Sequence, residues 1–229
     1  MSEAGFDAFA ESYDADLHRA LSASGEGKEF FARGRIAWLT ATMARRGEQP
    51  KSVLDFGCGT GSATPMLQDA GFVRLFGVDV SEKSIEVARA THPHLADCFR
   101  TVSEYKPDGD FDLAYTNGVF HHIPPAERLG SARYVWSALR PGGYFAFWEN
   151  NPWNPGTRYV MSNCVFDHDA ITLTPPESRK LLREAGFEIV ATDFLFIFPH
   201  ALRWFRFLEP ALSSLPLGGQ YMVLCRKPA

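Results

Sequence analysis

The feature that most constrains this chain is a glycine-rich turn that directly follows a short apolar segment. Residues 53–61 read Val-Leu-Asp-Phe-Gly-Cys-Gly-Thr-Gly, and residues 63–70 after them have a helical pattern. Glycines at alternate positions tolerate positive φ and let the backbone approach a ligand closely. The order strand, glycine turn, helix therefore predicts a site for a nucleotide-like ligand at the start of an α/β fold.

The spacing within this turn separates two classes of ligand. A dinucleotide fingerprint has the spacing G-x-G-x-x-G and binds a pyrophosphate at the helix N-terminus. Here Gly61 comes one residue too early for that pattern, and Asp55 precedes the turn. A carboxylate in this place repels a diphosphate and suits a positively charged ligand. The alternative interpretation is a glycine turn of purely structural use.

The turn resembles the first motif of the class I S-adenosylmethionine-dependent methyltransferases, D/E-x-G-x-G-x-G. The matching residues are Asp55, Gly57, Gly59 and Gly61, and Cys58 lies inside the motif. S-adenosylmethionine carries an ammonium and a sulfonium group and no phosphate, which agrees with the carboxylate. The resemblance covers residues 53–147 best and implies that these five residues bind the cofactor, with S-adenosylhomocysteine as product.

A second acidic residue, Asp79, ends the next apolar run, 24 residues after Asp55. This interval is close to the ~20 residues at which an acid at the end of the second strand meets a ribose. The family resemblance implies that Asp79 holds the ribose and that Val80 packs on the adenine. Alternatively, Asp79 is only a turn residue. Ser81 is expected to cap a helix over residues 82–90.

Two further family positions lie after the third and the fourth expected strands. The family usually has an acid after the third strand that reads the adenine, whereas this chain has Thr101 and Ser103 there. Either hydroxyl could accept the same hydrogen bond, and we take Thr101 as the candidate. Asn117 matches the family position whose backbone contacts the methionine part of the cofactor.

Two adjacent histidines, His121 and His122, are the candidate catalytic residues. They follow an expected parallel strand, and ligands bind beyond the carboxyl ends of such strands. Adjacent side chains are not expected to share a face, so we expect His121 to face the pocket and His122 to pack. In the alternative, both only bond local backbone groups. Glu149 is a further candidate base.

The N-terminal segment resembles the lead-in of small-molecule methyltransferases, in which an aromatic segment folds over the cofactor. Residues 6–14 read Phe-Asp-Ala-Phe-Ala-Glu-Ser-Tyr-Asp, and Tyr13 is the candidate lid residue. Phe6, Phe9 and Tyr13 also have the i, i+3, i+7 spacing of one helical face, so a helix packed on the core is the alternative. No leader sequence is recognised, and a cytoplasmic location is expected.

The molecule that accepts the methyl group is expected to bind to two insertions, residues 150–174 and 199–219. The first is a proline-containing loop, and its candidate substrate-binding residues are Asn150, Asn151, Trp153 and Arg158. Asn and Pro could instead shape only the backbone, and Arg158 could pair with Asp167 or Asp169.

The second insertion, residues 199–219, is unusually apolar and contains two arginines. A cap over a hydrophobic substrate, a dimer or membrane-surface contact, and a cover for the sheet edge compete as interpretations. We favour a cap or plain core packing, because two arginines are few for a membrane-surface helix. The aromatic and apolar content favours a partly hydrophobic acceptor.

Alternating patterns predict a doubly wound, mostly parallel, seven-stranded α/β sheet in one domain. Strands are expected near residues 52–56, 75–78, 97–102, 111–116, 144–149, 188–198 and 220–226. The last strand is expected to be an antiparallel edge strand, as in the family's terminal hairpin. Residues 1–48 would form a helical lid and residues 49–149 the cofactor-binding core.

Composition agrees with one enzyme domain. The chain has 229 residues, 45% of them hydrophobic, and a net charge of −4, which argues against a nucleic-acid partner. Its four scattered cysteines predict neither a metal site nor disulfides. No integral membrane association is expected, and the oligomeric state is left open. The predicted activity is methyl transfer to a small molecule; a non-catalytic cofactor-binding module and an NAD(P)-dependent oxidoreductase are the alternatives.

Overall fold

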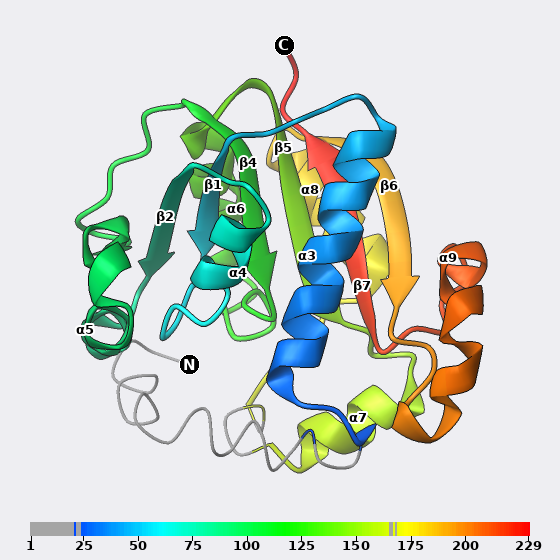
Figure 1. Cartoon of the computed structure of the whole chain (residues 1–229). Coiled ribbons are helices and arrows are strands. Elements are labelled where there is room, and N and C mark those ends of the chain that lie inside the picture. Colours follow the sequence, from blue (N-terminus) through cyan, green and yellow to red (C-terminus); the bar gives the residue numbers. More distant parts are fainter. Residues whose placement is uncertain (1–20, 22–23, 165–166, 168) are drawn as a thin grey trace.

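The computed structural model describes Leu21, residues 24–164, Asp167 and residues 169–229 (Figure 1). Tyr13 and the rest of the aromatic segment 6–14 lie outside these residues. The described chain forms a seven-stranded sheet of order β3-β2-β1-β4-β5-β7-β6. The strands are β1 (Ser52–Phe56), β2 (Arg74–Asp79), β3 (Phe99–Thr101), β4 (Phe111–Asn117), β5 (Leu139–Asn150), β6 (Glu188–Leu195) and β7 (Gln220–Arg226). The predicted mostly parallel sheet with an antiparallel last strand is confirmed.

The position of β7 differs from the expectation. It pairs antiparallel with both β5 and β6, so it lies inside the sheet and β6 forms the edge. The physical reason is burial, because residues 221–225 of β7 are all buried, whereas most of β6 is only half-buried. A continuous apolar run such as Tyr-Met-Val-Leu-Cys is typical of a strand covered on both faces.

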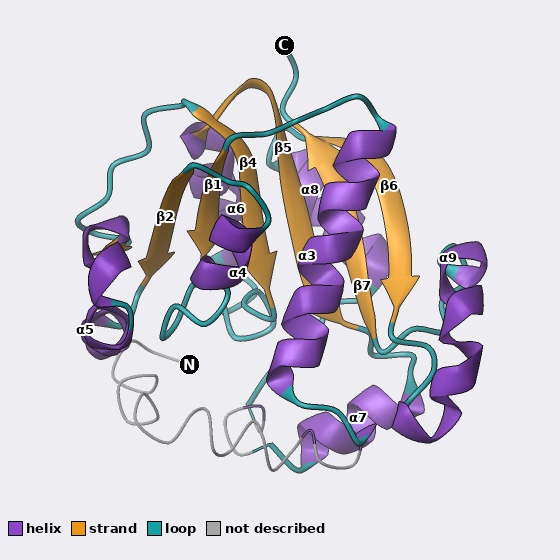
Figure 2. Cartoon of the chain, in the orientation of Figure 1, coloured by secondary structure: helices purple, strands orange, loops and turns teal. Residues whose placement is uncertain are grey.

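Helices cover both faces of this sheet (Figure 2). Helices α3 (Lys28–Arg45) and α4 (Thr64–Asp69) lie on one face, and α6 (Arg128–Ala138) and α8 (Pro175–Glu184) lie on the other (Figure 1). The remaining helices are α5 (Glu82–Thr91), η2 (Pro93–Cys98), α7 (Pro155–Ser162), η4 (His200–Leu208) and α9 (Glu209–Leu212). In the described part of the chain, no helix has the length and apolar character needed to cross a membrane.

Alternation along the strands divides the core into two layers. Val53 of β1 packs in the layer under α3 and α4, and Leu54, the next residue, packs in the layer under α6 and α8. Helix α3 contributes an apolar stripe to the first layer, since Ile36, Leu39 and Met43 are buried there. The sheet is thus fixed from both sides, and its strand ends are held rigidly at one edge.

Local signals in the sequence set several boundaries. The Ser81 hydroxyl accepts a hydrogen bond from the Ser84 N–H and caps α5, as predicted. Thr174 and Glu177 form a capping box at the start of α8. Gly142, in the exposed first part of β5, has φ +75°, a conformation that glycine adopts readily.

The second insertion forms η4 and α9 beside the end of β6 (Figure 1). No side chain of either helix is buried, so the expectation of plain core packing is wrong. The insertion instead covers the end of the edge strand: the Ser213 carbonyl accepts from the Phe194 N–H at 2.7 Å, and the Glu209 carboxylate accepts from the Phe196 and Phe198 N–H groups. These contacts satisfy backbone donors that the edge strand leaves unpaired.

Candidate functional site

The glycine turn joins β1 to the segment before α4, and its backbone requires glycine. Gly57, Gly59 and Gly61 have φ values of +75°, +52° and +75°. A Cβ at Gly57 would overlap the Val119 side chain, and one at Gly61 would overlap Phe99. A Cβ at Gly59 would meet no atom of the described residues within 4 Å. The turn therefore packs on the protein at two glycines and presents bare backbone at the third.

Asp55 lies near the end of β1, and its carboxylate is buried. The residue is 4% exposed, and its Oδ2 has no hydrogen-bond partner among the residues that the structure describes. Burial, reinforced by the nearby Asp79 carboxylate, raises the pKa of Asp55 to about 7, although the Arg35 guanidinium opposes this shift. An unpaired buried carboxylate is costly unless a ligand pairs with it. This is the environment that an ammonium or sulfonium group would complete.

Asp79, at the end of β2, fixes the glycine turn. Its Oδ2 accepts a hydrogen bond from the Gly59 N–H at 2.8 Å, and its Oδ1 accepts from the Ser81 N–H at 2.9 Å. These two bonds hold the Asp79 carboxylate at the edge where β1 and β2 end. Val80 beside it is 47% exposed, unusual for a large apolar side chain, and is accessible to a flat ring.

Thr101 and Asn117 lie at the ends of β3 and β4. The Thr101 hydroxyl pairs with the Ser103 hydroxyl at 2.9 Å and accepts from the Glu104 N–H at 3.2 Å. Thr101 stands opposite Asp79 in the sheet register, which keeps it at the cofactor edge. Asn117 lines a cavity at the end of β4, the strand that pairs with β1.

Arg35 of α3 is a buried cation that sequence reasoning missed. It is 7% exposed, and its guanidinium donates from Nε to the Tyr115 hydroxyl at 3.0 Å and from Nη1 to Gln220 Oε1 at 2.8 Å. Gln220 in turn donates to Asn150 Oδ1 at 3.0 Å. A signal was present: Arg35 adjoins the apolar stripe of α3, where a charged residue is unusual. It brings a positive charge to the edge where β1 and β4 end.

The two histidines differ from the expectation that they point apart. Their ring centroids are 4.1 Å apart, and Nε2 of each lies 3.4 Å from Asp167 Oδ1. The expectation assumed regular secondary structure, but His121 and His122 lie in a turn after β4. Both histidines line the cavity. Asp167, which brings them together, comes from the first insertion and was named in the sequence only as a partner for Arg158.

Glu149 of β5 lies behind His121. Its Oε2 is 2.6 Å from His121 Nδ1, and its Oε1 accepts from the Phe120 N–H at 2.8 Å. Burial favours neutral His121, but the Glu149 and Asp167 carboxylates outweigh it and raise the pKa of His121 to about 10. Burial and the neighbouring His121 lower the pKa of His122 to about 3. Glu149 is 1% exposed, so it supports His121 and does not itself reach the cavity.

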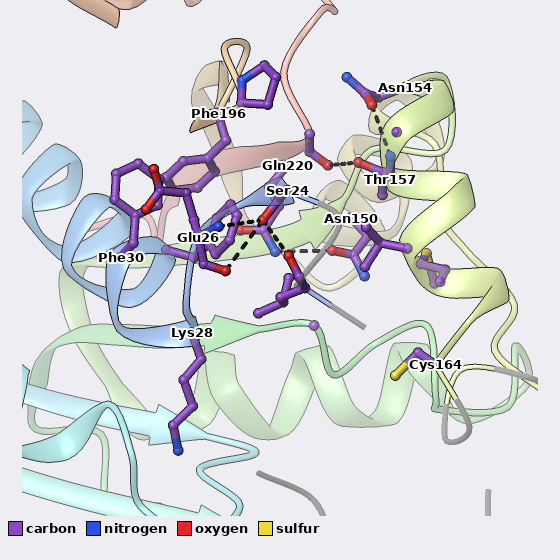
Figure 3. A pocket seen from close by; sticks show the side chains of 18 of the residues that line it. Ser24, Glu26, Lys28, Phe30, Asn150, Asn154, Thr157, Cys164, Phe196 and Gln220 are labelled. Carbon is purple, nitrogen blue, oxygen red and sulfur yellow. Dashed lines mark hydrogen bonds between the residues drawn. The ribbon is translucent and has the colours of Figure 1, made fainter. Parts of the chain in front are cut away.

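The cavity has a volume of about 390 Å³ and extends from the ends of β4 and β5 to α7 and η4. Phe30 and Phe196 form an aromatic wall on one side, with ring centroids 6.0 Å apart, and Cys164 lies on the other side (Figure 3). The Asn150 and Gln220 amides, joined by their hydrogen bond, lie between them (Figure 3). Pro199 and Arg206 bring the second insertion to the rim, as the cap interpretation requires.

The four candidate substrate-binding residues have different surroundings. Asn150 lines the cavity. Asn151 is a correction: it is fully buried, and its amide donates to the Gly218 carbonyl at 2.8 Å, so it fixes the loop instead. Trp153 and Arg158 are also corrections, because both are exposed and neither lines the cavity. The amide that caps α7 is Asn154, through the Thr157 N–H.

Comparison with known proteins gives a consistent family. Residues 29–192 match the family described as "Methyltransferase domain". An uncharacterized methyltransferase of Synechocystis sp. is 32% identical over 148 residues, which are 61% of this chain and 68% of that protein. The 27-O-demethylrifamycin SV methyltransferase of Amycolatopsis mediterranei is 32% identical over 159 residues, which are 62% of this chain and 55% of that protein. The match thus spans little more than half of the second relative.

Solved structures share the fold over nearly the whole chain. The magnesium protoporphyrin IX methyltransferase of Synechocystis PCC 6803, solved with bound S-adenosylhomocysteine, superposes with a TM-score of 0.62 and 20% identity, covering 96% of this chain and 97% of that one. A possible histamine N-methyltransferase of Thermotoga maritima gives a TM-score of 0.63 and 21% identity, covering 97% and 98%. At such identities the likeness shows the fold alone.

Proposed function

The chain belongs to the methyltransferase-domain family and is an S-adenosylmethionine-dependent methyltransferase; from this premise we propose that its acceptor is a small, partly hydrophobic molecule. The observation that carries the proposal is the cavity of about 390 Å³ at the ends of β4 and β5, where β4 is the neighbour of the strand that leads into the glycine turn. Its volume is within the range of small-molecule sites, ~300–1,000 Å³.

Several residues of this chain would hold the cofactor. The buried Asp55 carboxylate would pair with a positive group, and Asp79 would accept hydrogen bonds from the ribose hydroxyls. Gly59 would allow the cofactor to approach the backbone closely, because it has no side chain on the side that the described residues leave open. Arg35 would bind the carboxylate of the methionine part, since its guanidinium lies at the same edge. When bound, S-adenosylmethionine supplies an electrophilic methyl group.

The lining of the cavity supports a mixed acceptor. Phe30, Phe31 and Phe196 pack against one another, and an apolar portion of the acceptor would lie on these rings. The Asn117, Asn150 and Gln220 amides would bond polar groups and fix its orientation. Holding the two reactants in line and away from water supplies much of the rate enhancement in transfers of this kind, ~7 kcal/mol or more.

The names of the relatives agree with a small acceptor. The Amycolatopsis relative is named for a rifamycin, and the Synechocystis structure for magnesium protoporphyrin IX. Other relatives are named for ribosomal protein L11, but this chain spans 39% of the Burkholderia mallei proteins of that name. A cytoplasmic location is part of the proposal, supported by the scattered cysteines, none of which forms a disulfide in the described chain.

Two measurements test this function. Calorimetry should detect binding of S-adenosylhomocysteine and none of NADH. Methyl-labelled S-adenosylmethionine, incubated with a panel of phenols, polyketides, carboxylic acids and amines, should then label at least one small molecule. Binding without turnover across the whole panel would support the non-catalytic module instead, and labelling confined to proteins would overturn the small-molecule acceptor.

A further inference from the structure

Three potential metal ligands converge at one end of the cavity. The Nε2 atoms of His121 and His122 each lie 3.4 Å from Asp167 Oδ1, and all three ligand atoms lie within 4.8 Å of one another. We propose that His121, His122 and Asp167 bind a divalent first-row metal ion such as Zn²⁺. Scattered cysteines gave no reason to expect a metal, but none of these ligands is a cysteine.

The distances suit one small cation. Zn²⁺ binds histidine nitrogen and carboxylate oxygen at ~2.0–2.2 Å, so two such atoms on a tetrahedral ion lie ~3.4 Å apart. Both histidine–aspartate distances have this value. Two imidazoles and one carboxylate are also a donor set that first-row divalent ions favour.

The arrangement behind His121 is typical of a metal-binding histidine. Glu149 accepts from Nδ1–H, and Nε2 faces Asp167, so a metal ion bound at Nε2 would displace the proton that the neighbouring carboxylates otherwise keep there. The Phe120 N–H donates to the other oxygen of Glu149 and so holds this carboxylate in place. The carboxylate in turn fixes the orientation of the His121 ring. Metal-bound histidines usually donate their second nitrogen to a carboxylate or carbonyl in this way.

His121 Nε2 gives an independent indication of a ligand. The side chain is 2% exposed, and among the described residues this nitrogen has no partner with the distance and angle of a hydrogen bond, although Asp167 Oδ1 lies 3.4 Å away. In the competing interpretation, Asp167 is only the counterion of a doubly protonated His121, and a directed hydrogen bond would then be expected. A cation between the three atoms would satisfy this nitrogen and both neighbours at once.

All three residues line the cavity, so the remaining coordination positions are directed to the acceptor space. An open position distinguishes a catalytic metal from a closed structural one. If the proposed function holds, an acceptor oxygen bound there would lose its proton more easily. Metal binding itself does not depend on that function.

The experiment begins with full-length protein stripped by a chelator and titrated with Zn²⁺ in a calorimeter. We expect one ion per chain. Glu149→Gln should weaken binding by ~10–100-fold, and Asp167→Asn or His122→Ala by more than ~100-fold. His94→Gln, at an exposed histidine distant in sequence, is the matched control and should bind as the wild type does.

A second measurement does not depend on how the variants fold. Co²⁺ bound to the wild type should give visible d–d bands without a thiolate charge-transfer band. Absence of saturable Zn²⁺ binding, a thiolate band, or equal affinity in wild type, Asp167→Asn and His122→Ala would overturn the proposal. Binding of S-adenosylhomocysteine is measured in parallel and shows that each variant is folded; its absence from the wild type would count against the cofactor site alone.

Discussion

The proposed cofactor side and the proposed acceptor side of this site are built in different ways. The cofactor side uses backbone from residues 55–61 and the nearby Asp79, so one short segment supplies most of it. The acceptor side combines side chains from α3, the turn after β4, the first insertion and β7. Local backbone geometry fixes the first, and tertiary packing fixes the second. The difference explains why the cofactor, and not the acceptor, can be named.

The largest effect is expected on the cofactor side. Asp55→Ala removes the buried carboxylate and should weaken S-adenosylhomocysteine binding by about 2–4 kcal/mol, or roughly 30- to 1,000-fold in Kd. Calorimetry measures this loss. Asp69→Ala, at an exposed acid at the end of α4, is the control and should bind normally. Unchanged affinity in Asp55→Ala would contradict the interpretation that the Asp55 carboxylate binds a positive group of the ligand.

Backbone geometry can be tested separately from charge. Gly57→Ala should lower the free energy of unfolding by about 2–4 kcal/mol, because positive φ and overlap with Val119 both oppose the new methyl group. Gly47→Ala is a matched control, since it has the same φ of +75° but no atom within 4 Å of the added Cβ. It should cost only ~1 kcal/mol in a urea titration. Equal losses would mean that packing on Val119 is unimportant.

The raised pKa of Asp55, about 7, predicts a pH dependence. The ammonium group of S-adenosylhomocysteine prefers the ionised carboxylate, so affinity for this ligand should rise roughly tenfold between about pH 6 and pH 8. The ligand-free protein should behave oppositely: its folded pKa lies above the unfolded value, so stability falls as pH rises toward 7. Asp55→Asn should remove this pH dependence of the free energy of unfolding. If the affinity of the wild type for S-adenosylhomocysteine did not change between about pH 6 and pH 8, the prediction would be contradicted.

The smallest effect is expected at the exposed residues of the first insertion. Arg158→Ala should leave the KM for the acceptor unchanged and should change the free energy of unfolding by no more than about 0.5 kcal/mol. The reason is that the Arg158 side chain is exposed and does not line the cavity. Steady-state kinetics and urea unfolding measure both. Asn150→Ala, which changes a cavity-lining amide, is the comparison and should raise KM. A larger effect at Arg158 would extend the acceptor site beyond the cavity.

The same contrast sets how much could be predicted from sequence. Asp55, the glycines and Asp79 lie in a motif whose spacing carries its meaning, and the strands around them were recognised with it. The cavity could not be assembled in this way, because its contacts join distant parts of the chain. Arg35 meets Tyr115 across 80 residues and Gln220 across 185. A single sequence contains no signal for such pairs.

Two errors have specific physical causes. The histidines were expected to diverge because the expectation treated their segment as regular structure, whereas a turn allows both rings to meet Asp167. Asn151 was assigned to the substrate because exposed amides in loops often bind ligands. Its side chain instead bonds the Pro216 and Gly218 carbonyls of the second insertion. Sequence indicated the chemistry of these side chains, but not their burial.

The reversed direction of β7 has a consequence for synthesis. Its first residue, Gln220, lies at the cavity only because this strand runs against its neighbours. During synthesis, the glycine turn and Asp79 are translated early. Arg35 and Asn150 can form their hydrogen bonds with the Gln220 amide only after the final strand has been translated. The nascent chain therefore has its cofactor turn long before it has a complete acceptor cavity, and premature termination before β7 would leave that cavity unfinished.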